Sequence, residues 1–154
     1  MKVGGSIVTT TRPDSSTVIR TSFIDGQMKS ISGTGTYAMS YDYGLHSENG
    51  GGLYTQVTKA NGTEWTKTYA DQLGRTFQTE YADGALESVA YYSQSAALGS
   101  RGQVASTTDA DGVTTFFAYN AEGERVKTTE ELSGGQFRIT ETDNQVVTLS
   151  LIHI

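Results

Sequence analysis

The chain has 154 residues, a formal net charge of −6, 18 glycines and nine tyrosines, and it contains no cysteine. Without cysteine there is no disulfide framework, no thiolate nucleophile and no zinc site of the cysteine type. The acidic excess, with no cluster of Lys and Arg, disfavours nucleic acid as a partner, because a phosphate backbone would be repelled. A sequence rich in Thr and Tyr and interrupted by Gly predicts an all-β fold.

Four runs along the chain alternate large and small or polar side chains, which is the pattern of a half-buried strand. Each run places two large side chains on one face: Trp65 with Tyr69, Phe77 with Tyr81, Phe117 with Tyr119, and Phe137 with Ile139. No window shows a convincing helical stripe, and no apolar stretch has the length of a signal peptide or a membrane span. We therefore expect strands throughout and no membrane insertion.

Five turn signals separate these runs: Asp25-Gly26, Asn61-Gly62, Asp83-Gly84, Asp111-Gly112 and Ser133-Gly134-Gly135. Asn-Gly and Asp-Gly are typical of the type I′ hairpin turn, in which both central residues have positive φ. Five such signals in one short chain predict a meander of antiparallel hairpins.

The turns are in phase with tyrosines. Tyr69, Tyr91 and Tyr119 each follow a turn glycine by seven residues, so each Tyr is predicted to end the strand that the turn begins. The units that start at the turn glycines Gly62, Gly84 and Gly112 have lengths in the range of repeat arrays. The chain turns again at Gly74-Arg75 and at Gly123-Glu124-Arg125.

This pattern of Gly, a gap, Tyr-Asp, two residues and Gly-Arg resembles that of the RHS/YD-repeat proteins. The matching stretches are NGTEWTKTYADQLGRTFQTEY, DGVTTFFAYNAEGERV, DGALESVAYYS and residues 12–44. In this sequence the signature falls on Tyr41, Asp42, Gly62, Tyr69, Asp71, Gly74, Arg75, Gly84, Tyr91, Gly112, Tyr119, Gly123 and Arg125. Asp71 stands in for the family Asp with one residue inserted, and Tyr119 is followed by Asn120 instead of Asp.

The resemblance implies tandem antiparallel β-hairpins of the YD type, forming a twisted, curved sheet that is part of a larger shell. Bacterial polymorphic toxins, insecticidal-toxin shell subunits and animal teneurins are members of this family. Residues 1–148 are assigned to one partial array, and residues 149–154, LSLIHI, to a truncated or non-native tail. The implied role is a non-catalytic wall without cofactor, secreted or at the cell surface as part of a longer protein. Its partners would be neighbouring repeats and an encapsulated C-terminal toxin domain.

Two acidic clusters are candidate sites. Asp109, Asp111 and Gly112 resemble the opening of a calcium loop, but Thr114 and Asn120 fall where an EF-hand requires Gly and Glu. We predict a hairpin turn in which an Asp caps backbone N–H groups. The second set could supply paired carboxylates for glycoside hydrolysis, but is expected at outward, solvated positions: Glu64, Glu80 and Glu87.

His46 is the only internal histidine, so a metal site would rest on one nitrogen ligand, and a surface loop is the expected position. The aromatic residues have two interpretations, either stacking between neighbouring hairpins or a platform that stacks on sugars. They are Trp65, Tyr69, Phe77, Tyr81, Tyr91, Tyr92, Phe117 and Tyr119. The alternative function is therefore an extracellular adhesin or carbohydrate-binding β-module. In isolation the chain is expected to self-associate through its edge strands or to unfold readily.

Overall fold

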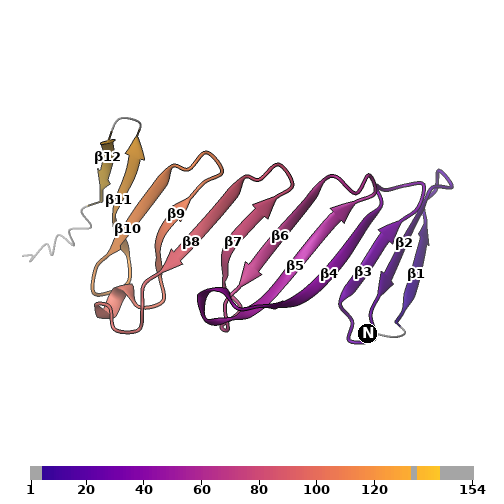
Figure 1. Ribbon diagram of the computed structural model, residues 1–154, viewed down its shortest axis with the longest axis horizontal. Helices are drawn as coiled ribbons and strands as arrows, with labels where there is room; N and C mark the ends of the chain where they lie inside the picture. Colours follow the sequence, from indigo (N-terminus) through magenta and orange to yellow (C-terminus); the bar gives the residue numbers. More distant parts are fainter. Residues whose placement is uncertain (1–4, 133–134, 143–154) are drawn as a thin grey trace, which may run out of the picture. The chain divides into compact units, whose positions relative to one another are not determined.

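The computed structural model describes residues 5–132 and 135–142, which confirm the all-β prediction (Figure 1). The chain divides into two compact units, Met1–Ser88 and Val89–Ile154, and the boundary falls within β8. The strands that begin in the first unit are β1 (Ile7–Thr11), β2 (Thr17–Ser22), β3 (Met28–Ser32), β4 (Met39–His46), β5 (Gly52–Lys59), β6 (Trp65–Ala70), β7 (Thr76–Tyr81) and β8 (Leu86–Tyr91). The second unit has β9 (Val104–Thr108), β10 (Thr114–Tyr119), β11 (Arg125–Leu132) and β12 (Gln136–Glu141). The tail at 149–154 lies outside the described residues.

Within each unit the strands follow one another in chain order, each antiparallel to its neighbour, as predicted. Two single-turn 3₁₀ helices interrupt them: η1 (Glu48–Gly50) follows β4, and η2 (Leu98–Ser100) follows β8. In the part of the chain that the structure describes, no helix is long and apolar enough to cross a membrane.

The hairpin turns share one hydrogen-bond pattern. In residues 71–75, the Asp71 N–H donates to the Arg75 carbonyl and the Gly74 N–H donates to the Asp71 carbonyl, both at 2.9 Å. The same two bonds close residues 23–27, 81–85, 109–113 and 120–124. In each turn the fourth residue is a glycine with φ between 77° and 87°.

The type I′ prediction is therefore wrong for these turns. Among the described residues, Ser15 and Asn49 are the only non-glycine residues with positive φ, so the residue before each of these glycines keeps negative φ. The pattern is a three-residue loop, a type I turn followed by one left-handed residue. Only that residue needs positive φ, and Gly adopts it without steric cost. Ser133 and Gly134 of the fifth turn signal lie outside the described residues.

A repeat of four strands underlies the array. Equivalent turns begin at positions 23, 71 and 120, so the interval between them is almost constant. Each is followed by a β-bulge at the same distance, which inserts Lys29, Phe77 and Val126 as the extra residue of the returning strand. The shorter units read from the turn glycines in the sequence thus mix two kinds of hairpin. Gly62 and Gly112 lie in the β5–β6 and β9–β10 turns, which precede an equivalent turn by one strand, whereas Gly84 lies in the β7–β8 turn, which follows an equivalent turn by one strand.

An extra residue displaces Tyr69 within this repeat. The turn between β5 and β6 spans six residues, with the Lys59 N–H bonded to the Glu64 carbonyl at 2.8 Å. Ala70, not Tyr69, consequently occupies the position next to the turn that Tyr119 occupies before Asn120. Asp71 aligns directly with Asn120, so the insertion lies in the earlier turn and not before Asp71.

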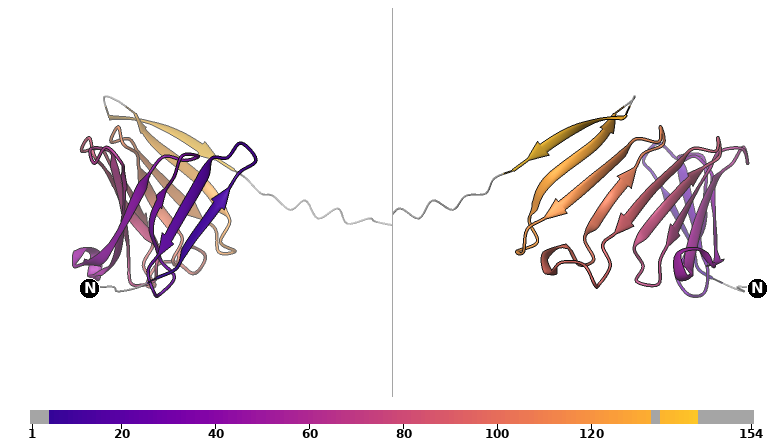
Figure 2. Two further views of the ribbon diagram at one scale, coloured as in Figure 1. Left: turned by 90° about the vertical axis from the view of Figure 1, so that its right-hand side faces the viewer. Right: turned by 60° about the vertical axis from the view of Figure 1, so that its left-hand side comes forward.

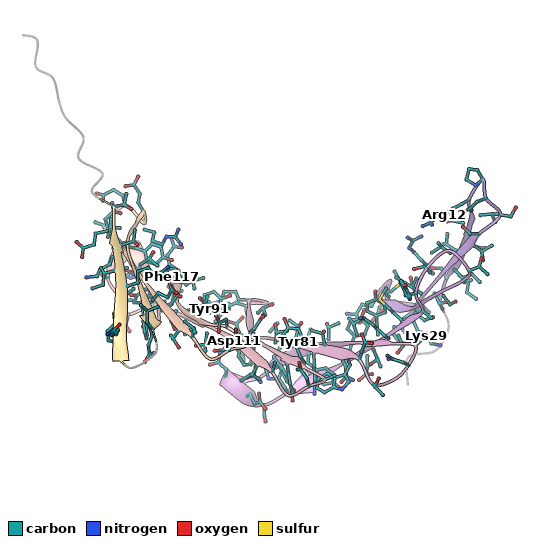
Figure 3. The ribbon with its side chains drawn as sticks, turned by 90° about the horizontal axis from the view of Figure 1, so that it is seen from above. Arg12, Lys29, Tyr81, Tyr91, Asp111 and Phe117 are labelled. Carbon is teal, nitrogen blue, oxygen red and sulfur yellow. The ribbon has the colours of Figure 1, made fainter. Side chains whose placement is uncertain are left out.

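Each unit is a single layer of strands (Figure 2), and its side chains project from both faces of that layer (Figure 3). None of the described side chains is fully buried, and the buried apolar residues are Val18, Tyr69 and Phe77. A sheet that lacks a second layer exposes apolar side chains on both faces, and this one exposes many. The main local core lies around Tyr69 and Phe77, at the turn that carries Asp71.

Candidate functional site

The Asp71 carboxylate organises its turn. Its Oδ1 accepts hydrogen bonds from the backbone N–H groups of Leu73 and Arg75, both at 2.9 Å, while Oδ2 accepts the Arg75 Nε at 2.9 Å. The Arg75 guanidinium also pairs with Oδ2 at 2.7 Å. The backbone N–H of Arg75 and, less strongly, its guanidinium lower the pKa of Asp71. The carboxylate is thus a structural anion of the turn.

In two further turns the side chain of the first residue accepts backbone N–H groups in the same way. Asn120 Oδ1 accepts the N–H groups of Glu122 and Glu124 at 3.1 and 2.8 Å. Asp109 Oδ1 accepts those of Asp111 and Val113 at 3.0 and 2.9 Å. The prediction that Asp109 caps a hairpin turn is confirmed. No three His, Asp or Glu side chains of the described residues are grouped so that they could hold a metal ion.

The 3₁₀ loop of each unit packs against one of these turns. In the first unit, Gln72 Nε2 donates to the Gly50 carbonyl at 2.6 Å, and a Cβ placed on Gly52 would lie 2.0 Å from the Ala70 carbonyl oxygen. In the second unit, a Cβ on Gly99 would lie 1.8 Å from the Asn120 carbonyl oxygen. Glycine is required at both positions because the loop backbone approaches the turn too closely for a side chain. No local pattern in the sequence signals these contacts.

A cluster of three rings lies beside this loop in the first unit, since a Cβ on Gly52 would lie 3.0 Å from His46 Nε2. The His46 ring lies 5.5 Å from Tyr69 and 5.4 Å from Phe77, and Tyr69 lies 6.2 Å from Phe77. His46 Nε2 is 2.8 Å from the Ala70 carbonyl, so that nitrogen carries the hydrogen. The surface-loop prediction for His46 is wrong. His46 ends β4 and is half-buried, since the β4–β5–β6 register brings it to the edge of the ring cluster.

A polar and aromatic row crosses the same face. Tyr54 lies over Gly44, its cross-strand partner, and its hydroxyl donates to Asp42 Oδ2 at 3.0 Å. The ammonium of Lys67 lies 4.2 Å from the Tyr54 ring centroid. The hydrogen bond to Asp42 raises the pKa of Tyr54, and the one to Tyr69 raises the pKa of Lys67. The row holds neighbouring strands together through side chains, as cross-strand pairs do in other sheets.

The candidate catalytic carboxylates are each engaged by a different neighbour. Glu64 bonds to Lys59 and Asn61, Glu80 accepts the Tyr69 hydroxyl at 3.0 Å, and Glu87 bonds to Tyr81. Glu87 faces Thr79 across the strands, so it lies on the opposite face from Glu80, which faces Leu86. The structure therefore brings no pair of them together. Glu80 and Glu87 are half-buried, not fully solvated as predicted.

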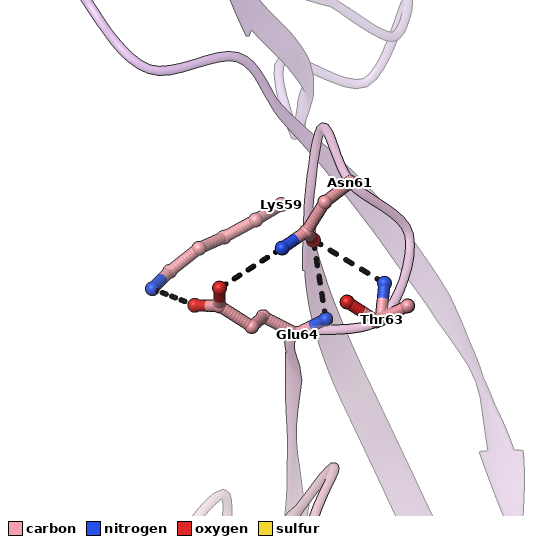
Figure 4. A network of polar contacts seen from close by, with 4 residues as sticks. All are labelled: Lys59, Asn61, Thr63 and Glu64. Carbon is pink, nitrogen blue, oxygen red and sulfur yellow. Dashed lines mark hydrogen bonds and ion pairs between the residues drawn. The ribbon is translucent and has the colours of Figure 1, made fainter.

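A surface cavity of about 480 Å³ lies beside the β5–β6 turn. Its lining includes Trp65, Tyr81 and Asp83 together with Lys59 and Glu64. Figure 4 shows the network at its rim, in which Lys59 pairs with Glu64 and Asn61 Nδ2 donates to Glu64 Oε1 at 2.9 Å. Lys59 and Asn61 lower the pKa of Glu64, so this carboxylate stays ionised. The cavity combines aromatic and charged groups.

The aromatic residues of the second unit bond to its own backbone. The Tyr119 hydroxyl donates to the Val104 carbonyl at 3.0 Å, and the Tyr92 hydroxyl donates to the Phe117 carbonyl at 2.8 Å. The rings of Tyr92 and Tyr119 meet edge to face at 6.2 Å. The Arg125 guanidinium lies 5.3 Å from the Phe117 ring centroid. These contacts give the aromatic residues a structural role.

The structure separates the signature residues into two groups. The turn glycines Gly62, Gly74, Gly84, Gly112 and Gly123 all have positive φ, and Asp71, Arg75, Tyr119 and Arg125 lie at or next to such turns. Tyr91 ends β8, as predicted. Tyr41 and Asp42, the only literal Tyr-Asp pair, lie within β4 and at no turn.

No protein-family model matches the chain, and no curated protein matches its sequence. Functional interpretation therefore rests on the repeat and on the contacts described above.

Proposed function

We propose that the chain is a non-catalytic segment of the wall of an RHS/YD-repeat shell. The proposal rests on one structural motif that recurs at the almost constant interval separating positions 23, 71 and 120. It consists of a three-residue loop with its left-handed glycine, followed by a bulge. In two of its occurrences an Asp or Asn caps the turn, and a 3₁₀ loop packs on it.

The packing supports a wall more than a globular module. A single layer with few buried side chains gains little from burial, so it requires neighbours before and after it. Those neighbours are further repeats of the same longer chain. The enclosed cargo is a C-terminal toxin domain, and the assembled protein acts outside the cell or at its surface.

The test uses a longer reading frame that contains this chain, expressed with its cargo region. Removing residues 71–119 joins Ala70 to Asn120 and deletes one full repeat, so every remaining turn keeps its loop. The matched control deletes only residues 71–94 and leaves a half repeat. We expect the cargo to stay protected from added protease after the first deletion and to be digested after the second. Protease-sensitive cargo in the intact protein would exclude encapsulation.

A second candidate function is carbohydrate binding at the cavity beside Trp65. Trp65 and Tyr81 could stack on a sugar ring, and Lys59, Glu64 and Asp83 could bond to its hydroxyl groups. Buried Tyr69, 7% exposed, and Phe77 cannot contribute to such a platform. A glycan that binds saturably, is lost in Trp65→Ala and is retained in Phe116→Ala would establish this function. Phe116 is the control because its side chain is exposed in the second unit.

A further inference from the structure

The strand β1 has the same position in the repeat as β5. Its following turn, residues 12–16, is closed by the bonds that close residues 109–113, with Ser15 at φ 64° in the place of the glycine. Before β1, a Cβ on Gly5 would lie 1.6 Å from the Ser22 carbonyl, just as one on Gly52 would lie 2.0 Å from that of Ala70. β5 is paired by β4 on its other side, whereas no described strand pairs with β1 beyond β2.

The strand β12 has the same position as β4 and β8. It pairs with β11, the bulge-bearing strand, as β4 pairs with β3 and β8 with β7. In the first unit the strand that follows this position is β5, the counterpart of β1. Among the described residues, no strand pairs with the outer edge of β12. The two free edges are therefore complementary in kind: one lacks a β4-type strand and the other is such a strand.

Both edges present open backbone groups and apolar side chains. The Arg12 N–H donates inward to Ser16, so by the alternation of an antiparallel ladder the N–H groups of Thr9 and Thr11 point outward. The Thr142 N–H donates inward to Val126, so the N–H of Glu141 points outward. Ile7 on β1 is 70% exposed and Ile139 on β12 is 55% exposed. β1 contains no charged residue or proline, the usual protection of an edge.

We propose that β12 of one copy of this chain pairs antiparallel with β1 of a second copy. The contact is head-to-tail, so each copy keeps one free edge and further copies can add. This inference follows from the strand positions in the repeat and does not depend on the shell function. If separate copies of the chain do not pair, the proposed shell function still stands, because within a longer protein the neighbouring strands belong to the same chain.

The test uses two proline variants of the full chain. Thr9→Pro removes an outward N–H from β1, and Glu141→Pro removes one from β12, while inward bonds of both strands are kept. Thr9→Ala and Glu141→Ala are the matched controls. In sedimentation velocity we expect the wild type and both Ala variants to form a concentration-dependent series of oligomers. Each Pro variant alone should be monomeric, and an equimolar mixture of the two should form a heterodimer and nothing larger.

Three outcomes would overturn the proposal. They are a wild type that stays monomeric up to its solubility limit, a Thr9→Pro variant that dimerises alone, and a Glu141→Pro variant that dimerises alone. The second would indicate pairing of β12 with β12, and the third pairing of β1 with β1. If circular dichroism shows that a Pro variant is unfolded, Ile7→Lys and Ile139→Lys replace the pair, because a charge blocks an edge without altering the backbone. The same outcomes apply to them.

Discussion

Asp71 bonds to Arg75 through both the backbone and the side chain of that residue. One carboxylate oxygen accepts the Arg75 N–H at 2.9 Å, and the other accepts the guanidinium Nε at 2.9 Å. Asn120 makes the same two kinds of bond to Glu124: its Oδ1 accepts the Glu124 N–H at 2.8 Å, and its Nδ2 donates to the Glu124 carboxylate at 3.0 Å. The two turns therefore share the backbone bond, and they differ in that the side-chain contact is an ion pair at Asp71 and a hydrogen bond of an amide at Asn120.

Asp71→Asn should destabilise the chain less than Asp71→Ala. The amide oxygen can accept the N–H groups of Leu73 and Arg75, as Asn120 does in its own turn, whereas alanine leaves both without the acceptor. Urea unfolding followed by Trp65 fluorescence measures the difference in midpoint. Both variants lose the ion pair with Arg75. Equal decreases in the midpoint would therefore mean that Asp71 stabilises the chain through the ion pair and not through its bonds to the backbone N–H groups.

Acid should weaken the turn at Asp71. Its pKa in the folded chain lies below the ordinary value of 3.8, so the stabilisation is complete above that value and is lost as the pH falls through the lower, folded pKa. Asp71→Asn should remove this part of the acid dependence. Some dependence should remain, because the pKa values of Asp14 and Glu64 are lowered too. Unfolding midpoints measured over an acid series compare the two proteins, and identical curves would contradict the assignment.

Gly112→Val should destabilise the chain by about 1–3 kcal/mol, because it forces a β-branched residue to a φ of 83°. A Cβ there would meet no atom within 4 Å, so the cost arises from the backbone alone. Ala110→Val is the matched control, since it adds the same side chain at negative φ in the same turn and should cost less than about 0.5 kcal/mol. Similar effects at 110 and 112 would refute the role assigned to the glycine.

Gly44→Ala should cost about 1 kcal/mol in the wild type and almost nothing in a Tyr54→Ala background. The added Cβ would lie 2.4 Å from the Tyr54 ring and would displace it from Asp42. A double-mutant cycle in urea gives the coupling. If Gly44→Ala costs the same in both backgrounds, the loss comes from the strand backbone and not from the ring.

The positions of the turns could be predicted from single residues, and their geometry could not. Glycine after Asp or Asn marks a place where positive φ is available, so Gly26, Gly84 and Gly112 located their hairpins correctly. The same dipeptides occur in type I′ turns and in three-residue loops. The choice between these turns depends on bonds from the residue three positions before the glycine, such as Asp109, which the dipeptide does not contain.

The phase of the repeat could not be predicted, because one residue reverses the face of a strand. Counting seven residues from Gly62 and from Gly112 aligned Tyr69 with Tyr119, but Thr63 lengthens the first turn and shifts Tyr69 to the position of Ala118. The position of His46 could not be predicted either, because it also depends on strand register. Its ring partners come from β6 and β7, and their proximity depends on a register that no local pattern specifies.

If this chain is one stretch of a longer repeat wall, the reading frame on both sides of it should show further repeats. We expect the flanking sequence to continue the array with turns like those at 71–75 and 120–124, in which glycine stands three positions after Asp or Asn, or like that at 23–27, in which it stands three positions after Phe23. These turns should recur at the interval separating positions 23, 71 and 120. One such interval upstream of the turn at 23–27 is the first place to look. A flanking frame of comparable length without such turns, or stop codons adjoining both ends in the native gene, would show that the chain is not a stretch of a longer repeat wall.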